Sequence, residues 1–282
     1  MKTIMIVIAG MGDLPDPITG WDTPLVSAAI PSLNMLAQRG EITAVPTINP
    51  DFEISHKNAL LSLLGYDLQR GEPSLQELME FGLNGKDPIT TYNSLRPFII
   101  PGFSAHGVCI TPSAWVRGVA KCALISPLDI YAPGASEVDI LETMAELACQ
   151  SVIDNEFVFL YVDSPLKASL KGSYEAKVSA LESIDQHLVN PIADFVWKSD
   201  LFINLAITTD LVTPWHRKRP AQMNVPLILY FNNHDREGDP DQSFTEVQAM
   251  LSPKNFNYPS DLMRYLTSFT VSDEEVNDDN PF

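Results

Sequence analysis

The stretch "IMIVIAGMGDLPD" (residues 4–16) decides the fold class of this chain. Its apolar run, residues 4–8, passes directly into a turn that contains Gly10 and Gly12. An apolar run that ends in a turn is typical of a strand buried on both faces, as in a parallel sheet. In α/β enzymes, ligands lie where such strands end, and an acid is common there. Here that position holds Ala9, so an apolar side chain stands where an acid would be expected.

Similar apolar runs alternate with helical patterns along nearly the whole chain. Strands are predicted at 3–9, 41–47, 107–111, 122–126, 156–163, 201–210 and 225–231. Helices are predicted at 31–39, 58–67, 114–121, 136–150, 174–197, 245–251 and 260–269. This alternation predicts an α/β fold of three layers, in which a mostly parallel central sheet carries helices on both faces. Ligands of such folds lie beyond the carboxyl ends of the strands, which here are residues 9–13, 111–118, 163–171 and 208–220.

Composition narrows the classes of function. The 282 residues carry a net charge of −18 and a pI near 4.5, so the chain repels phosphate backbones and anionic lipid surfaces. We therefore expect neither nucleic-acid nor membrane binding. The three cysteines, Cys109, Cys122 and Cys149, form no CxxC motif and sit among apolar residues. Reduced thiols and the absence of a signal-peptide pattern predict a cytoplasmic protein.

We expect a single domain over residues 1–271. Residues 86–103 are rich in proline and lack a clear periodicity, which predicts a connector. Residues 272–282 form an acidic tail, which we expect to be disordered.

Four stretches, in this order, resemble the archaeal-type cofactor-independent phosphoglycerate mutases of the alkaline phosphatase superfamily. The first is "GMGDLPD" (10–16) with "TPLVSAAIPSLNMLAQRGE" (23–41), and the second is "LLSLLGYD" (60–67). The third is "HGVCITPSAWVRGVAKCAL" (106–124). The fourth joins "AKVSALESIDQHLVNPI" (176–192), "ITTDLVTP" (207–214) and "VPLILY" (225–230). The resemblance covers about residues 1–266 and implies an alkaline-phosphatase-like core.

The resemblance also implies a chemistry that can be checked position by position. Enzymes of this kind are expected to hold two divalent ions, typically manganese, zinc or magnesium, beside a serine that accepts the phosphoryl group. The first metal aspartate of the family falls on Ala9 here, and two later ligands fall on Leu166 and Leu170. The family's Asp-His pair becomes Asp210-Leu211. Asp210 and Asp13 are therefore read as remnants, and no metal is expected unless the family chemistry survives.

The resemblance leaves two alignments open for the nucleophile and also implies positions that contact the substrate. Counting back from Gly65 places His56 at the serine position, and a shift of one residue places Ser55 there. Arg117 falls on an arginine that the resemblance assigns to the substrate's anionic groups. The basic loop with His216 and Arg217 also suits a small anion, although exposed basic loops are common. Asp13 is expected as a surface or turn acid, or otherwise as a displaced ligand.

Three readings follow. The first is a catalytically inactive relative of phosphoglycerate mutase with a binding or regulatory role. The second is a phosphatase or phosphotransferase with a rewired site that uses Asp210, Ser55 or His56, together with His216 and Arg117, and it requires these residues to converge. The third is a phosphoglycerate mutase whose site has been placed in the wrong register. The family's cap domain has no counterpart of its size here, since only residues 86–103 stand in that interval. The partner is unknown, and an edge strand could pair two copies.

Overall fold

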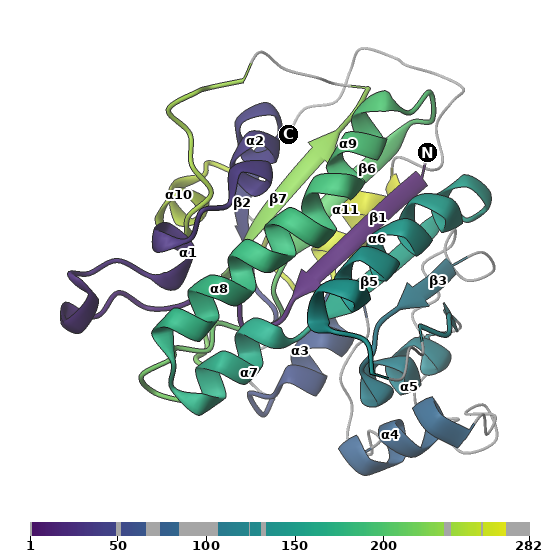
Figure 1. Cartoon of the computed structure of the whole chain (residues 1–282), viewed down its shortest axis with the longest axis horizontal. Coiled ribbons are helices and arrows are strands. Elements are labelled where there is room, and N and C mark those ends of the chain that lie inside the picture. The colour runs from purple at the N-terminus through teal and green to yellow at the C-terminus, as the bar shows by residue number, and fades with distance from the viewer. Residues whose placement is uncertain are drawn as a thin grey trace.

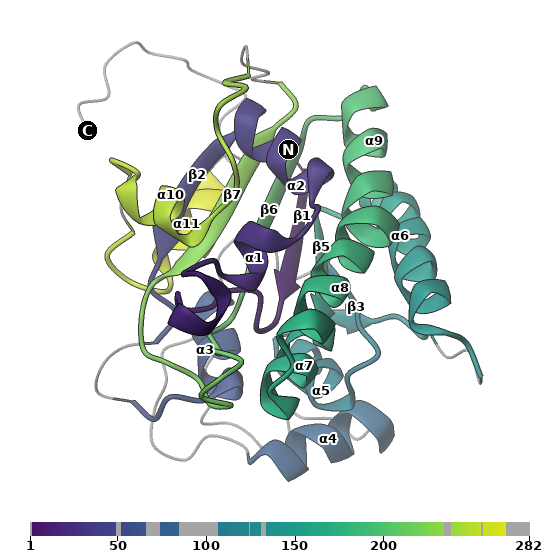
Figure 2. The ribbon, with the colours of Figure 1, turned by 60° about the vertical axis from the view of Figure 1, so that its left-hand side comes forward.

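A computed structural model describes residues 2–48, 52–65, 74–84, 107–123, 125–130, 134–233, 238–254 and 256–268. Figures 1 and 2 show helices on both faces of one twisted sheet. The expected α/β fold with three layers is therefore confirmed. The predicted connector and acidic tail lie outside the described residues, so the expected domain bounds stay predictions.

The sheet has seven strands in the order β2-β7-β6-β1-β5-β3-β4. They are β1 (Lys2–Ile8), β2 (Glu41–Val45), β3 (Gly107–Ile110), β4 (Ser126–Pro127), β5 (Phe157–Val162), β6 (Ile203–Thr208) and β7 (Val225–Phe231). Strand β7 is antiparallel to both of its neighbours, and the remaining pairs are parallel. The expected strand at 122–126 is wrong, because Cys122 ends helix α5 and the short strand begins at Ser126.

Helices connect and cover these strands. They are α1 (Pro24–Ser27), α2 (Pro31–Arg39), α3 (His56–Leu63), α4 (Leu75–Asn84), α5 (Ala114–Cys122), α6 (Glu137–Asp154), α7 (Ser164–Lys171), α8 (Tyr174–Ile184), α9 (Asn190–Lys198), α10 (Glu246–Leu251) and α11 (Asp261–Ser268). A short 3₁₀ turn covers Pro17–Thr19. Among the described helices, none is both long and apolar enough to cross a membrane.

Two apolar cores form because successive side chains of a strand point to opposite faces. Ile4, Ile6 and Ile8 of β1 pack under α2, α6, α8 and α9, whereas Met5 and Val7 pack under α3, α4, α5 and α11. Every one of these five side chains is fully buried. The continuous apolar strands read from the sequence are thus those of a sheet covered on both faces.

The long helix predicted over 174–197 contains a π turn at Asp185–Val189, which joins α8 to α9 without a break. Pro191 explains this irregularity, since proline has no N–H and its ring collides with the carbonyl one turn earlier. A π turn opens the helix at that place. Asp185 is buried there and accepts hydrogen bonds from the backbone amides of Ser32 (3.0 Å) and Leu33 (2.7 Å). It thereby caps helix α2, which has no side-chain cap of its own.

Candidate functional site

The carboxyl ends of β1, β5 and β6 meet at one edge of the sheet, because these strands are parallel neighbours. The loop after β1 brings Ala9 and Asp13 to this edge, and the loop after β6 brings Asp210. Helix α3 begins at His56 beside them. The expected edge is therefore the place where these sequence-distant residues come together.

Asp210 is completely buried and lies at the centre of a set of hydrogen bonds. Its Oδ2 atom receives His56 Nδ1 at 2.7 Å and the Tyr161 hydroxyl at 3.3 Å. Its Oδ1 atom receives the amide of Leu211 at 2.8 Å and the Thr209 hydroxyl at 3.4 Å. Both carboxylate oxygens are thus occupied by protein donors, which offset the cost of burying the charge.

His56 is the reactive group that faces this carboxylate. Burial is the largest influence and lowers the pKa of His56, but the negative charge of Asp210 and its hydrogen bond outweigh burial, so the pKa is raised above 6.5. Its Nε2 atom lies 3.4 Å from the hydroxyl of Thr213. The imidazole side chain is 19% exposed, so solvent reaches it while Asp210 holds its orientation.

Tyr161, which was not among the predicted site residues, also contacts Asp210. Burial and then the charges of Asp210 and Asp163 raise the pKa of Tyr161 well above its usual value. Its hydroxyl therefore stays protonated and donates to Asp210. Tyr161 lies within an entirely apolar run of residues 157–162, and this run gave no signal that one hydroxyl would reach the site.

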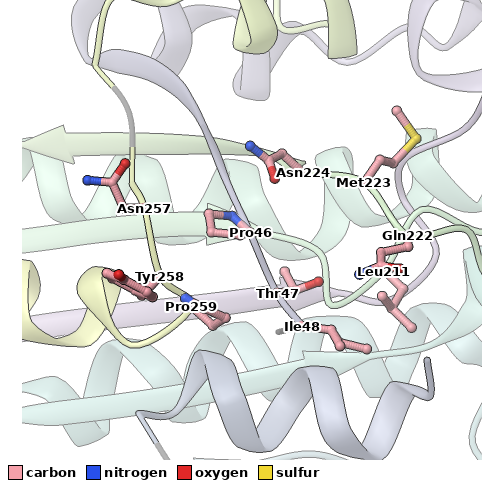
Figure 3. Close-up of a pocket in the computed structure, with 10 residues that line it drawn as sticks. All are labelled: Pro46, Thr47, Ile48, Leu211, Gln222, Met223, Asn224, Asn257, Tyr258 and Pro259. Carbon is pink, nitrogen blue, oxygen red and sulfur yellow. The ribbon is translucent and has the colours of Figure 1, made fainter. Parts of the chain in front are cut away.

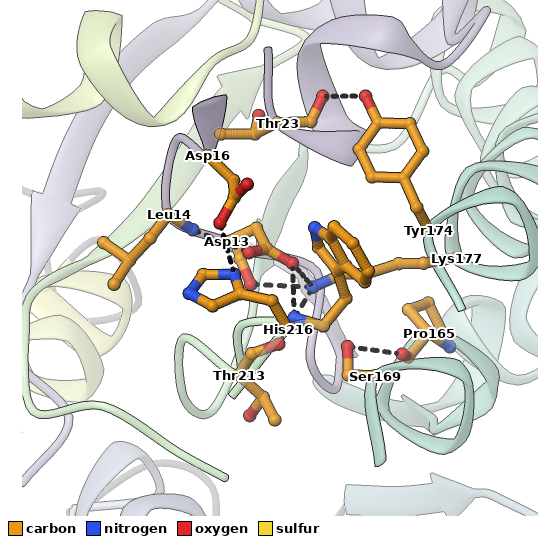
Figure 4. Close-up of polar contacts among 12 residues, drawn as sticks. Asp13, Leu14, Asp16, Thr23, Pro165, Ser169, Tyr174, Lys177, Thr213 and His216 are labelled. Carbon is orange, nitrogen blue, oxygen red and sulfur yellow. Dashed lines mark hydrogen bonds and ion pairs between the residues drawn. The ribbon is translucent and has the colours of Figure 1, made fainter. Parts of the chain in front are cut away.

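Asp13 lies in the loop after β1 but is buried and ion-paired, so the expectation of a surface acid is wrong. Its Oδ2 atom lies 2.6 Å from the ammonium of Lys177, and the side chains of both residues are fully buried. The ammonium also donates to the backbone carbonyls of Gly12 (3.0 Å) and Thr213 (3.1 Å). All three of its donors are satisfied. Figure 4 shows Lys177 beside Asp13.

Glu246 completes what we call the Asp13–Lys177–Glu246 cluster. One oxygen of Glu246 accepts the amide of Asp13 at 3.0 Å, and the other accepts the hydroxyl of Thr23 at 2.9 Å. Burial raises the pKa of Glu246 and lowers the pKa of Lys177, and the Asp13 charge opposes the shift at Lys177. The cluster joins the loop after β1 to α8, α10 and the loop after β6. A signal for it exists in the sequence, because Lys177 lies on the apolar stripe of its helix with Leu181.

The positions aligned with metal ligands are apolar. Ala9 and Leu211 are buried, and Leu166 packs against the same core as Ala9. Gly10 has a φ of +71°, and a Cβ there would lie 2.6 Å from the Cα of Leu166, so α7 sits directly on the turn after β1. Leu170 differs from these residues, because it is 50% exposed.

The donors present do not fit a centre with two metal ions. Within the described ranges, no three or more His, Cys, Asp or Glu side chains lie together so that they could hold a metal ion. Asp210 already accepts hydrogen bonds from His56, Tyr161 and the Leu211 amide, and the Thr209 hydroxyl is shared between its Oδ1 atom and the Leu211 carbonyl. Carboxylate and imidazole ligands of a dication need free lone pairs, and here those of Asp210 are used.

The remaining predicted residues do not converge on this site. The hydroxyl of Ser55 accepts the amide of Asn58 at 3.2 Å and so caps helix α3. Arg117 forms an ion pair with Asp129 at 2.6 Å and donates to the carbonyl of Leu128 at 3.3 Å. Of the residues that the rewired-site reading requires, His56 and Asp210 are the two that the structure brings into contact.

The basic loop after Thr213 is held by its own neighbours. His216 Nδ1 lies 3.5 Å from Asp16, and its Nε2 accepts the Nε–H of Arg217 at 3.3 Å. The ring of Trp215 meets Tyr174 edge-on at 5.8 Å, and its amide donates to Asp13 at 3.1 Å. Residues 217–219 are exposed.

Comparisons with known proteins agree with this fold and with the sequence resemblance. The chain is 22% identical over 220 residues to the 2,3-bisphosphoglycerate-independent phosphoglycerate mutase of Methanococcus aeolicus, covering 77% of this chain and 52% of that one. It is 24% identical over 127 residues to the enzyme of the same name from Aeropyrum pernix, covering 45% of this chain and 30% of that one. The chain thus spans about half, or less, of the length of these curated relatives. No family model matches it.

Solved structures extend the comparison to the fold. The PH0037 protein of Pyrococcus horikoshii superposes with a TM-score of 0.73 at 20% identity, over 98% of both chains. The cofactor-independent phosphoglycerate mutase of Thermoplasma acidophilum gives 0.62 at 15% identity, over 95% of this chain and 100% of that one. The alkaline phosphatase of the Antarctic bacterium TAB5 gives 0.53 at 9% identity, over 95% of this chain and 97% of that one. The chain is therefore similar in sequence to the archaeal cofactor-independent phosphoglycerate mutases, and its fold is similar to those of the Thermoplasma mutase and the TAB5 alkaline phosphatase.

Proposed function

We propose that this chain is a phosphoglycerate mutase-like protein that acts by binding, in a regulatory or assembly role, and not by two-metal phosphoryl transfer. One observation carries the proposal. Asp210, the carboxylate that stays at the position of the family's Asp-His pair, accepts hydrogen bonds from His56, Tyr161 and the Leu211 amide. The other positions aligned with metal ligands nearby are Ala9, Leu166 and Leu211.

The physical argument concerns charge. Two-metal phosphoryl transfer needs several carboxylates and imidazoles around two dications. Without the ions, those carboxylates would repel one another in a buried space, which is costly. Apolar residues at the same positions remove that cost, and protein donors neutralise the one acid that stays. The arrangement is therefore stable without metal, and it leaves the fold available for binding.

The test is an activity measurement with matched variants. Purified protein is assayed for interconversion of 2- and 3-phosphoglycerate and for hydrolysis of p-nitrophenyl phosphate, with manganese, zinc or magnesium added, beside an active archaeal mutase as control. We expect no turnover above the buffer rate and no difference between the unaltered protein and Asp210→Asn. Metal-dependent turnover that Asp210→Asn abolishes would overturn the proposal.

A second candidate function rests on the contact between His56 and Asp210. An imidazole held by a buried carboxylate and partly open to solvent is suited to accept a proton or to attack phosphorus without a metal. A phosphatase or phosphotransferase of this kind would hydrolyse p-nitrophenyl phosphate in the presence of chelator. His56→Ala would abolish that rate, and Ser55→Ala would preserve it, since the Ser55 hydroxyl caps a helix.

The predicted small anion has its best remaining place at the loop of residues 216–219. Arg117 is less suited to it, because two of its nitrogens are already bonded to Asp129 and Leu128. Pairing with a second copy and a place in the cytoplasm also stay predictions.

A further inference from the structure

A hollow opens at the same edge of the sheet, and Leu211, which follows Asp210 in the chain, lies among the residues that line it. We call it the sheet-edge pocket, and Figure 3 shows the residues that line it. Its volume is about 350 Å³, which lies within the range of small-molecule sites. The lining comes from the segment after β2, the segment before β7 and the loop before α11: Pro46, Thr47, Ile48, Leu211, Gln222, Met223, Asn224, Asn257, Tyr258 and Pro259.

The pocket has an apolar floor and a polar rim. Thr47, Ile48 and Leu211 form a buried floor, and Ile48 and Leu211 belong to one small apolar cluster with Ala59 of α3. The rim carries three carboxamide side chains, those of Gln222, Asn224 and Asn257. All three are exposed, and no hydrogen bond of their side-chain amides is found within the described part of the chain. Such a floor and rim are the usual anatomy of a small-molecule site.

Charge argues against an anionic occupant. None of the ten described residues that line the pocket is Lys, Arg, His, Asp or Glu. The molecule as a whole carries a net charge of −18, which raises the energy of any further negative charge at its surface. A phosphate ester would therefore find neither a cation to pair with nor a favourable field.

We propose that the sheet-edge pocket binds an uncharged, flat small molecule with both hydrogen-bond donors and acceptors on its edge, of the class of a purine nucleoside. This inference rests on the proposed binding function and names its ligand class. A carboxamide offers one acceptor and two donors, so it pairs with the mixed edge of a nucleobase. The ring of Tyr258 and the rings of Pro46 and Pro259 supply apolar surfaces against which a flat ring can lie.

Ligand binding would be felt at the candidate site, because Leu211 is common to both. Its side chain lines the pocket, and its backbone amide donates to Asp210 at 2.8 Å, which in turn holds His56. A ligand resting on Leu211 therefore lies one residue away from the His56–Asp210 pair. The ring signals of His56 give a local report on whether the pocket is filled.

The experiment is a titration of the full chain with adenosine and guanosine, followed by calorimetry and by the NMR signals of His56. Adenosine 5′-monophosphate, guanosine 5′-monophosphate and 3-phosphoglycerate are titrated in parallel. We expect at least one nucleoside to bind and to shift the His56 signals, and its monophosphate to bind more weakly. Asn224→Ala and Asn257→Ala should each weaken nucleoside binding about fivefold, the equivalent of one hydrogen bond of about 1 kcal/mol. Gln248→Ala, an exposed amide on α10 outside the pocket, should leave it unchanged.

Three results would overturn the inference: no nucleoside binding, tighter binding of a monophosphate or of 3-phosphoglycerate, or nucleoside binding that both rim substitutions leave intact. The rim residues are exposed, so their replacement by alanine does not threaten folding. The turnover assay separates this failure from that of the proposed function. A chain that shows no metal-dependent turnover and binds no nucleoside would contradict the proposed ligand class and leave the proposed function standing.

Discussion

At the scale of single residues, Asp13 and Lys177 form a fully buried ion pair. Both side chains are fully buried, and the ammonium has exchanged its water for one carboxylate and two carbonyls. Such a pair adds little stability relative to an apolar replacement, but breaking it strands a buried charge. Its position between the loops after β1 and β6 makes it the contact that holds the candidate site's two main loops together.

Lys177→Met should lower the free energy of unfolding by about 3–5 kcal/mol, because it leaves the Asp13 carboxylate buried without its partner. Lys198→Met removes an ammonium from an exposed pair with Asp194, and it should change stability by less than about 0.5 kcal/mol. Urea unfolding followed by circular dichroism measures both. Adding Asp13→Asn to Lys177→Met should restore part of the loss. A Lys177→Met protein as stable as the Lys198→Met protein would show that the pair is not the anchor described here.

The His56–Asp210 pair makes stability depend on pH in one direction. The pKa of His56 in the folded chain is raised above 6.5, so protonated His56 stabilises the fold. This contribution is fully present below pH 6.5, the unfolded value, and is lost as the pH rises through the folded pKa. NMR titration of the imidazole protons should give a pKa above 6.5, and Asp210→Asn should lower it. A His56 pKa below 6.5 in the unaltered protein would contradict the geometry.

At the scale of elements, α7 is the helix that packs on the turn after β1, at the edge of the sheet where ligands of this fold class lie. It follows β5 directly, where the resemblance led us to expect metal ligands, and Leu166 rests on Gly10. The turn at Gly10 needs a positive φ, and the approach of α7 also needs the missing side chain. Closing the site is thus a matter of helix placement as well as of lost ligands.

Gly10→Ala should destabilise the chain through both effects, whereas Gly20→Ala isolates the first of them. Gly20 has a φ of +69°, close to the +71° of Gly10, but nothing lies within 4 Å of its would-be Cβ. We expect a loss of about 1 kcal/mol for Gly20→Ala and about 1–3 kcal/mol more for Gly10→Ala, the range of overpacked sites. Thermal and urea unfolding compare the two variants. Equal losses would mean that α7 does not press on the turn.

Periodicity was enough to predict most elements because their apolar faces are continuous, as in β1, β5 and the stripe of Val178, Leu181 and Ile184. Helices α1, α4 and α7, the short 3₁₀ turn and the π turn escaped it, and for α7 and the π turn the physical reason is visible. In α7 the run of residues 164–171 buries only Pro165, Ala168 and Ser169, so it carries little apolar pattern. The π turn depends on Pro191 and on the need for a cap at α2, and the second of these is a tertiary contact.

The contacts of the candidate site also divide into those that the sequence could predict and those that it could not. The contact of His56 with Asp210 was reachable from the register of the resemblance, because both residues fall on expected positions. The engagement of Arg117 by Asp129 was not, since it depends on how α5 packs against the loop that follows β4. The burial of Asp13 was missed because its partner lies more than a hundred residues away in the chain.

At the scale of the whole molecule, the surplus of negative charge is the dominant property. The net charge of −18 resides on a fold with continuous apolar cores on both faces of the sheet, so cohesion comes from packing while the surface repels itself. The same surplus is part of the reason to expect an uncharged ligand at the sheet edge.

Salt should therefore stabilise the folded chain. Raising sodium chloride from about 0.02 M to about 0.5 M shortens the screening length several-fold and weakens the repulsion. We expect the melting temperature to rise by at least about 2 °C, which corresponds to roughly 0.5–1 kcal/mol for a chain of this size. Potassium chloride should act equally, since screening depends on ionic strength. A melting temperature that stays constant or falls would show that self-repulsion does not limit stability.

The π turn at Asp185–Val189 has a consequence for how the gene that encodes this chain could change. A π turn is a helix with one additional residue, so deleting a single codon inside it could restore regular helical hydrogen bonding. Ile192 and Val196 would then stay on the core face, because the wider π turn already takes up the additional residue. Asp185 lies within that turn, so its hydrogen bonds to the start of α2 are the contacts that such a deletion would disturb. The apparent irregularity is therefore an insertion that the fold uses to cap α2.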